Sequence, residues 1–496
     1  MTTPPPGGLP GLPLAAAPAR VLEELAALRA RDVPHEGGRL FAYVFEHGDA
    51  DLGRLQMQAY AAFSAVNMLD PTAFPSVAAL ENDVVGAMLD VFGAPDDAVG
   101  TFTSGGTESC MLAVKAARDV GGGARAQGRR RNVVLADSAH PAFAKAAAWL
   151  DLDVVQVPVD PDRLTADAGA TLRAVDDDTC LVVASAVGYP HGVLDPVAEL
   201  AAGCAAREVP LHVDACIGGL VLAGRRALGE EVPPFDLSVP GVTSLSVDLH
   251  KYGYALKPAS VLLFRDRAMR RASWFGYGAW AGYPLVNSTI QSTKSAGPLA
   301  AAWVTLRAMG AQGYLRAYAA QLEASRRIVD AVEGAPGLGL RVLGEPAASL
   351  VALASDVLDV GAVADAMRAR GWHLQTQLPY GAAPASLHLT VDVATAATVG
   401  DMLADLADAC AQVRSDPPPG VPEELAAALG ALTVDQVTPQ ALAGLLAAAG
   451  LDGGTDGGLV LDARVSAMLQ AMEPRVRAAV ALLVTDGIFT PVRSEP

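Results

Sequence analysis

A lysine that follows a histidine at the end of an apolar segment has the clearest potential for covalent chemistry in this sequence. The segment Val242–Val247 alternates in the way typical of a strand, and His250, Lys251 and Gly253 follow it. Burial and nearby positive charge lower the pKa of a lysine, so its neutral amine can attack a carbonyl carbon and form a Schiff base. Most lysines in such a place are surface residues, so Lys251 needs support from other segments.

A pair of glycines between a predicted strand and a predicted helix gives the first support. The segment Val99–Thr103 is typical of a strand and is followed by Gly105 and Gly106. Thr107 is a candidate N-cap for the next helix, where Glu108 suits the helix dipole. Glycines in front of a helix N-terminus allow backbone N–H groups to close on a phosphate. The spacing is neither that of a dinucleotide fingerprint nor that of a nucleoside-triphosphate loop, and an ordinary strand-to-helix turn is the alternative.

An aspartate at the end of another predicted strand gives the second support. Asp214 ends the apolar segment Leu211–Asp214, and Cys216 and a pair of glycines follow it. A carboxylate in this place can keep a pyridinium nitrogen protonated, which makes the ring an electron sink. A cap for the following helix is the alternative role of Asp214.

The order of these three features resembles the pyridoxal-phosphate enzymes of the group II decarboxylase family and, within it, the sphingosine-1-phosphate lyases. The likeness extends from about residue 38 to residue 413. It implies pyridoxal 5'-phosphate as cofactor and an α/β fold of the PLP-dependent transferase type (fold type I), in which a mostly parallel sheet is followed by a smaller C-terminal α+β domain. The stretches that carry the resemblance are Thr103–Ser109, His191–Val197, His212–Gly219 and Asp248–Tyr254.

The resemblance also implies roles for individual residues. Lys251 would bind the cofactor covalently, Asp214 would face the pyridine nitrogen and His140 would stack on the ring; these three are the expected catalytic residues. Cys216 would lie against the other face of the ring, with a buried core thiol as the alternative. The cofactor phosphate is expected to contact Gly105, Gly106, Thr107 and His250 of one subunit and Thr293 of its neighbour.

Four further residues are candidates for contacts with an amino substrate. Asn67 and Asp70 lie in the segment that resembles the substrate-phosphate region of the lyases, but the family has a histidine where this chain has Asp70. An aspartate would repel a phosphate, so a phosphorylated substrate is in doubt. Lys257 matches a family lysine that follows the Schiff-base lysine, and Tyr283 stands where a substrate-facing tyrosine could fall; both favour a lyase.

Three functions therefore remain open at this point. A retro-aldol lyase that breaks the Cα–Cβ bond of an amino substrate is the first interpretation. An L-amino-acid decarboxylase, which breaks the bond from Cα to the carboxylate, is the alternative. A scaffold that keeps the fold without catalysis is the third, and the presence of Lys251, Asp214 and His140 argues against it.

Composition restricts the partners. The 496 residues carry a formal net charge of −18, which argues against nucleic acid and against an anionic membrane surface. The five cysteines show no CxxC spacing, so we expect reduced thiols in a cytoplasmic protein and no metal site. No apolar run is long enough for a membrane span.

The chain is expected to have four parts. Residues 1–60 form an N-terminal arm, with 1–17 disordered and an amphipathic helix from Pro18 to Arg31. Residues 61–315 form the large cofactor-binding domain, in which predicted strands end near His140, Ser185, Asp214 and Lys251. Residues 316–415 form the small domain, and 416–496 a linker and helical tail without an assigned role. The resemblance implies a homodimer with shared active sites, to which the arm contributes.

Overall fold

The structure is a computed structural model that describes residues 15–126, 128–418, 420–448 and 462–491. The disorder expected for residues 1–17 falls mostly outside the described residues, which begin at residue 15. Central to the fold is a seven-stranded sheet with the order β1-β9-β8-β7-β6-β4-β5. Its strands are β1 (Val99–Thr103), β4 (Asn132–Ala136), β5 (Asp153–Val157), β6 (Thr179–Ser185), β7 (Leu211–Asp214), β8 (Val242–Asp248) and β9 (Ser260–Phe264).

Strands β5, β4, β6, β7 and β8 are parallel, whereas β9 runs antiparallel to both β8 and β1. Strands β4, β6, β7 and β8 contain valine and leucine and are buried on both faces, as strands covered by helices on both sides must be, whereas β5 lies at the edge and is more exposed. The expected mostly parallel α/β fold is therefore confirmed. Because the parallel strands end at one edge, residues that follow β4, β6, β7 and β8 meet there.

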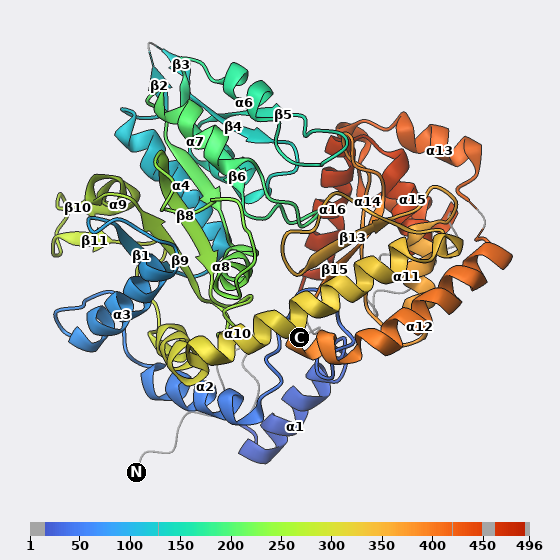
Figure 1. The fold of residues 1–496 in the computed structure, drawn as a ribbon, viewed down its shortest axis with the longest axis horizontal. Helices are drawn as coiled ribbons and strands as arrows, with labels where there is room; N and C mark the ends of the chain where they lie inside the picture. Colours follow the sequence, from blue (N-terminus) through green and yellow to red (C-terminus); the bar gives the residue numbers. More distant parts are fainter. Residues whose placement is uncertain (1–14, 127, 419, 449–461, 492–496) are drawn as a thin grey trace, which may run out of the picture.

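Helices cover both faces of this sheet (Figure 1). On one face, α4 (Gly106–Val120), α5 (Ala142–Trp149) and α9 (Arg267–Ser273) share an apolar cluster that includes Met111, Phe143 and Met269. On the other face, the cluster includes Val84, Leu200, Leu222 and Leu299. The helices of that face are α3 (Pro75–Val91), α7 (Val197–Ala205), α8 (Gly219–Ala227) and the start of α10 (Gly297–Glu333), with α6 (Ala168–Ala174) packed beside α7.

Helix α10 connects two apolar cores. The sequence suggests two helices here, and the structure has one element with a kink at Gly310, whose φ of 54° and ψ of 177° are not helical. Leu299 and Leu322 pack against the central sheet, whereas Ile328 and Val332 pack in the second core. The expected boundary at residue 315 falls inside this helix.

The second core lies between a four-stranded antiparallel sheet and two helices. The sheet has the order β12-β13-β15-β14, with β12 (Arg341–Val342), β13 (Leu350–Ala354), β15 (Ser386–Thr390) and β14 (Gln375–Gln377). Strand β14 was not anticipated from the sequence. Helices α11 (Val360–Ala369) and α12 (Val393–Ser415) cover the sheet, and η1 (Pro336–Leu338) precedes it.

The remaining elements surround these cores. Short hairpins are formed by β2 (Arg125–Ala126) with β3 (Arg129–Arg130) and by β10 (Phe275–Tyr277) with β11 (Leu285–Asn287). Helix α1 (Pro18–Arg29) is exposed along its whole length. Helix α2 (Ala50–Phe63) packs on α10, and residues 67–71 form a loop after it.

The tail folds into a small helical unit. It contains α13 (Glu423–Gly430), η2 (Val434–Gln436), α14 (Pro439–Ala448), α15 (Ala463–Ala471) and α16 (Pro474–Ile488). Leu429, Met468 and Val476 form its core, and the backbone N–H of Ala463 donates to Asp365 of α11 at 2.8 Å. The tail thus packs on α11, beside which it lies in Figure 1. None of the helices that the structure describes is both long enough and apolar enough to cross a bilayer.

Candidate active site

A cavity of about 400 Å³ lies at the carboxyl ends of the parallel strands. The strand edge brings together most of the predicted cofactor residues from segments far apart in the sequence. Ser185, Tyr189 and Ile217 also line the cavity. The predicted residues that line it are Gly105, Gly106, Thr107, His140, Asp214, Cys216, His250, Lys251 and Lys257.

Lys251 is held in an ion pair. Its Nζ atom lies 3.0 Å from Oδ2 of Asp248, the last residue of β8. Burial alone would lower the pKa of Lys251, but the carboxylate of Asp248 outweighs it, so the pKa of this amine is raised above its ordinary value. Burial likewise opposes ionisation of Asp248, but Lys251 and His250 outweigh it and lower the pKa of that carboxyl. The expected lowering of the lysine pKa is therefore wrong for this arrangement.

Asp214 is fixed by its neighbours. One of its carboxylate oxygens accepts from the Cys216 backbone N–H at 3.1 Å and from the Ser246 hydroxyl at 3.5 Å. Ser246 in turn lies 3.2 Å from Nε2 of His212, which also contacts Ser244 at 2.8 Å. Burial lowers the pKa of His212 to about 4, so this ring is neutral and can exchange hydrogen bonds with both hydroxyls. These hydrogen bonds thus hold the carboxylate of Asp214 in place at the wall of the cavity.

His140, which follows β4, also lines the cavity. Its Nδ1 atom accepts from the Ala142 backbone N–H at 3.2 Å, which fixes the ring. Burial lowers the pKa of His140, with Asp214 opposing and Lys251 reinforcing the effect. A neutral, fixed imidazole provides a flat surface on which an aromatic ring can stack.

The glycine turn is shaped for close approach to a ligand. Gly105 has a φ of 145°, and a Cβ atom on Gly106 would lie 2.8 Å from both Oδ2 of Asp248 and Sγ of Cys216. The cap of α4 is Gly105, two residues before the predicted Thr107, because the glycine adopts the backbone angles that start the helix. The first N–H groups of α4 therefore face the cavity beside His250, as phosphate binding requires. The residues present fit pyridoxal phosphate: a helix N-terminus, an amine, a flat imidazole and a carboxylate.

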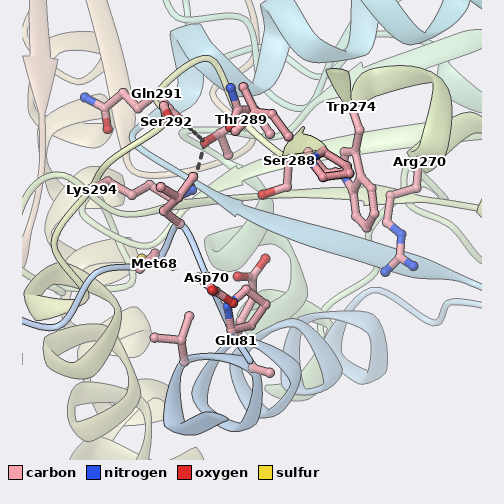
Figure 2. Close-up of a pocket in the computed structure, with 18 of the residues that line it drawn as sticks. Met68, Asp70, Glu81, Arg270, Trp274, Ser288, Thr289, Gln291, Ser292 and Lys294 are labelled. Carbon is pink, nitrogen blue, oxygen red and sulfur yellow. Dashed lines mark hydrogen bonds between the residues drawn. The ribbon is translucent and has the colours of Figure 1, made fainter. Parts of the chain in front are cut away.

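The other predicted substrate residues lie elsewhere in the subunit. Asp70 and Tyr283 line a second cavity of about 630 Å³, which shares no described lining residue with the first. Figure 2 shows this cavity, in which Lys294 donates to Thr289 at 2.8 Å and Asp70 lies above Glu81. Asn67 pairs with Ser295 in an isolated bridge. Thr293, between two lining residues, does not itself line either cavity.

Glu108 links the two cavities. Its Oε2 atom accepts from the Ser104 backbone N–H at 2.6 Å, and Oε1 accepts from the Ile290 N–H at 2.9 Å. The position of Glu108 in the sequence predicts only an interaction with the helix dipole. The loop that carries Thr289 and Lys294 is therefore fastened to the glycine turn, although the two lie far apart in the sequence.

Tyr189 is a cavity residue that sequence analysis missed. Its ring stacks on His388 with centroids 4.4 Å apart, and its hydroxyl donates to Gln375 at 2.6 Å. Both partners belong to the small sheet, so Tyr189 connects that sheet to the cavity. The sequence feature that could have identified Tyr189 is its position shortly after the end of β6.

Comparison with known proteins decides the family. Residues 44–353 match the family described as "Pyridoxal-dependent decarboxylase conserved domain". The chain belongs to this family. It is 36% identical over 415 residues to a sphingosine-1-phosphate lyase of Oryza sativa, a match that covers 82% of this chain and 75% of that protein. A "probable L-tyrosine/L-aspartate decarboxylase" of Methanothermobacter thermautotrophicus is 31% identical over 321 residues, which are 64% of this chain and 84% of that protein.

Solved structures of the family share the fold. The sphingosine-1-phosphate lyase of Burkholderia pseudomallei has a TM-score of 0.76 and 35% identity, with 83% of this chain and 94% of that chain covered. A glutamate decarboxylase of Lactobacillus brevis has a TM-score of 0.71 at 20% identity, with 83% and 97% covered, and supports the fold alone. The predicted pyridoxal-phosphate cofactor and carbon–carbon lyase activity are thus confirmed at the level of the family.

The tail also has a counterpart. Residues 423–484 match "Pyridoxal-dependent enzyme, C-terminal putative HTH domain". Sequence analysis assigned no role to this part and predicted helices there without a named motif. The structure places α13 to α16 within or across that range.

Proposed function

We propose that this lyase cleaves the Cα–Cβ bond of a 2-amino-3-hydroxy substrate by retro-aldol chemistry, as the sphingosine-1-phosphate lyases it resembles would. The observation that carries the proposal is the cavity in which Lys251, Asp214, His140 and Lys257 converge at the strand edge. Identity of 31–36% to sphingosine-1-phosphate lyases over 77–82% of the chain supports the same class of substrate.

Three residues would engage the ring and aldehyde of the cofactor in this proposal, and others its phosphate. Bound pyridoxal phosphate supplies an electron sink for the electron pair released when a bond at the substrate α-carbon breaks. Lys251 would hold its aldehyde carbon, Asp214 would keep a proton on its ring nitrogen and His140 would lie against the ring. The N–H groups at Gly106 and Thr107 and the imidazole of His250 would bind its phosphate.

Retro-aldol cleavage also needs a base that takes the proton of the substrate 3-hydroxyl. Lys257 is suited to this task, because burial and then the charge of Lys251 lower the pKa of its amine. Its Nζ atom donates to the backbone carbonyl of Tyr43, which orients the side chain at the cavity wall. Lys257 therefore acts at the hydroxyl, and Lys251 at the α-amino end.

A homodimer with shared sites is part of the proposal. The loops with Asn67 and with Thr293 lie against each other, because the Met68 N–H donates to the Lys294 carbonyl at 2.9 Å. Both loops border the second cavity and not the Lys251 cavity of their own subunit, so we assign them to the active site of a partner. The exposed apolar side chains of α1 support an arm that packs on the partner: Val21, Leu22, Leu25 and Leu28.

Decarboxylation is the second candidate, and Asp70 favours it. Its carboxylate accepts from Thr72 and Ala73, and the hydrogen bond from the Thr72 hydroxyl lowers the pKa of Asp70, so this residue is ionised. A negative charge at this position disfavours a phosphate on the substrate.

Product analysis distinguishes the candidates. The holoenzyme is incubated with sphingosine 1-phosphate, with unphosphorylated sphingosine, and with L-tyrosine, L-aspartate and L-glutamate. Long-chain aldehyde with an amino alcohol or its phosphate is the expected result. Carbon dioxide with an amine, and no aldehyde, would overturn the retro-aldol assignment. Lys251→Ala is the matched control, because any product that persists in it does not arise at this site.

A further inference from the structure

Two cysteines and an aspartate converge at the floor of the Lys251 cavity. The Sγ atoms of Cys110 and Cys216 and a carboxylate oxygen of Asp214 all lie within 4.8 Å of one another. The three residues come from different elements, since Cys110 belongs to α4, Asp214 ends β7 and Cys216 follows it. All three are buried, with exposed fractions of 1%, 7% and 8% for Cys110, Cys216 and Asp214.

This donor set is not explained by packing alone. Cys180, Cys204 and Cys410 are also buried, but among the described residues only Cys110 and Cys216 belong to a group of three possible metal ligands. The role assigned above to Asp214 and Cys216 does not use Cys110. The proposed reaction therefore gives no role to Cys110, although its thiol lies beside a second thiol and a carboxylate.

We propose that the cofactor-free protein binds a thiophilic divalent cation, with Zn²⁺ preferred, through Cys110, Cys216 and Asp214. Two sulfur donors select Zn²⁺ over Mg²⁺ or Ca²⁺, which prefer oxygen ligands. Both thiols lose their protons on binding, so each Zn²⁺ releases two protons and no electron is transferred. The fourth position is open to water from the cavity or to the hydroxyl of Ser246, which lies 3.2 Å from Sγ of Cys216.

The local charges are compatible with a cation. The ammonium group of Lys251 is the nearest positive charge in the cavity, and it is neutralised by Asp248 at 3.0 Å. Two thiolates and the carboxylate of Asp214 would leave the occupied site with one net negative charge. The site is thus electrostatically suited to Zn²⁺ without a rearrangement of the lysine.

Metal and cofactor exclude each other in this proposal. Asp214 cannot serve a cation and a pyridine nitrogen at once, and Cys216 lines the same cavity, where it is expected against a face of the ring. The mutual exclusion of Zn²⁺ and pyridoxal phosphate depends on the proposed role of Asp214, whereas metal binding itself does not. Zn²⁺ would therefore hold the apo form in a state that cannot take up pyridoxal phosphate.

Cobalt and zinc titrations of the full-length apo protein under a non-thiol reductant test the proposal. One equivalent of Co²⁺ should produce thiolate charge-transfer absorption and the intense visible bands of tetrahedral coordination. Zn²⁺ should displace Co²⁺ without further proton release, and one equivalent of Zn²⁺ added to the metal-free protein should release two protons. Cys110→Ser should lower the Zn²⁺ affinity at least about 100-fold, as expected for loss of a direct ligand. Cys204→Ser, at a buried cysteine outside the group, should leave the affinity unchanged.

Two results would overturn the proposal: absence of thiolate bands in the wild type, or equal Zn²⁺ affinity in Cys110→Ser and wild type. Circular dichroism establishes that the variant is folded, and Cys110→Ala provides a second variant if the serine does not fold. Loading with pyridoxal phosphate before the titration should abolish the bands. Bands that persist at full cofactor occupancy would refute the role of Asp214 at the ring nitrogen and leave the metal site standing.

Discussion

The Oδ2 atom of Asp248 lies 3.0 Å from the Nζ atom of Lys251, so the proposed nucleophile is one half of a buried ion pair. The pair spans three residues across the turn after β8, and Asp248 is 2% exposed. The protein must break or exchange this pair when Lys251 reacts as a neutral amine.

Asp248→Asn should destabilise the apo protein by about 2 kcal/mol, less than the loss of one partner from a fully buried pair, because the partly buried ammonium of Lys251 loses its nearest counter-ion. The pair lowers the pKa of Asp248 and raises that of Lys251. Its stabilisation is therefore complete between the ordinary pKa values of the two groups, and falls as the pH drops through the folded-state pKa of Asp248. Urea unfolding at neutral and at acidic pH measures both effects.

Asp83→Asn is the matched control for that experiment. Asp83 pairs with Arg307 at 3.1 Å, but both side chains are more than half exposed. An exposed pair contributes little, so this variant should unfold like the wild type. Equal destabilisation by the two substitutions would contradict the importance of the buried pair.

Asp195 should make stability depend on pH in the opposite direction. Burial raises its pKa to about 6, despite hydrogen bonds from the Ala166 and Ser185 N–H groups. The folded state therefore holds a proton that the unfolded state releases near pH 4, so this contribution to stability is lost as the pH rises from about 4 to about 6. Asp195→Asn should remove that loss. The difference in unfolding free energy between this variant and the wild type, measured by urea unfolding, should therefore change between about pH 4 and about pH 6. A constant difference would refute the raised pKa.

Gly106→Ala should abolish or strongly weaken cofactor binding. The added Cβ atom would lie 2.8 Å from Asp248 and Cys216, at the floor of the cavity. The cofactor absorbance during titration with pyridoxal phosphate measures the loss. Gly86→Ala is the control, because nothing lies within 4 Å of its Cβ position in α3; it should bind the cofactor normally and gain about 0.5–1 kcal/mol in stability.

Mixed dimers test whether a partner completes the site. Lys251→Ala should be inactive, and Thr293→Ala should be weakly active. If Thr293 serves the neighbouring subunit, a mixture allowed to exchange subunits should recover up to about a quarter of wild-type activity, since half of the dimers carry one intact site. Lys251→Ala protein taken alone through the same exchange procedure gives the background activity. Activity no higher than the average of the separate variants would contradict a shared site.

The tail should not bind DNA, despite the description of its family. Residues 423–484 carry seven carboxylates and three arginines, a balance opposite to that of a phosphate-binding surface. Arg477 is also occupied, since it donates to the carbonyls of Met472 and Gln470. Fluorescence anisotropy with duplex DNA at low salt should show no binding. Salt-dependent binding by full-length protein that is lost on deletion of residues 420–496 would refute this expectation.

The sequence predicted the place of His140, Asp214 and Lys251 because parallel strands end at one edge, and each residue follows such a strand. It could not predict the contact from Glu108 to Ile290, since the two lie far apart in the sequence and neither has a distinctive pattern. The pairing of Lys251 with Asp248 was missed for a different reason. Residues three apart meet only when the turn after the strand has a particular geometry, which residue types alone do not specify.

The loops with Asp70 and Tyr283 show the limit of reasoning by motif. Their residues were assigned to one site with Lys251, but within a subunit they line a separate cavity. Motifs identify the residues that a reaction uses, and they do not say which copy of the chain provides them. The N-cap of α4 was misplaced by two residues because Gly105 starts the helix through its backbone angles and not through a side chain.

The course of α10 has a consequence for any attempt to divide this protein. Its first half belongs to the core of the central sheet and its second half to the core of the small sheet. A fragment cut at residue 315 would remove Tyr318 and Leu322 from the core of the central sheet and leave them exposed on the C-terminal piece, which keeps Ile328. The catalytic half and its smaller companion should therefore be produced as a single polypeptide, and neither should be recovered in usable form alone.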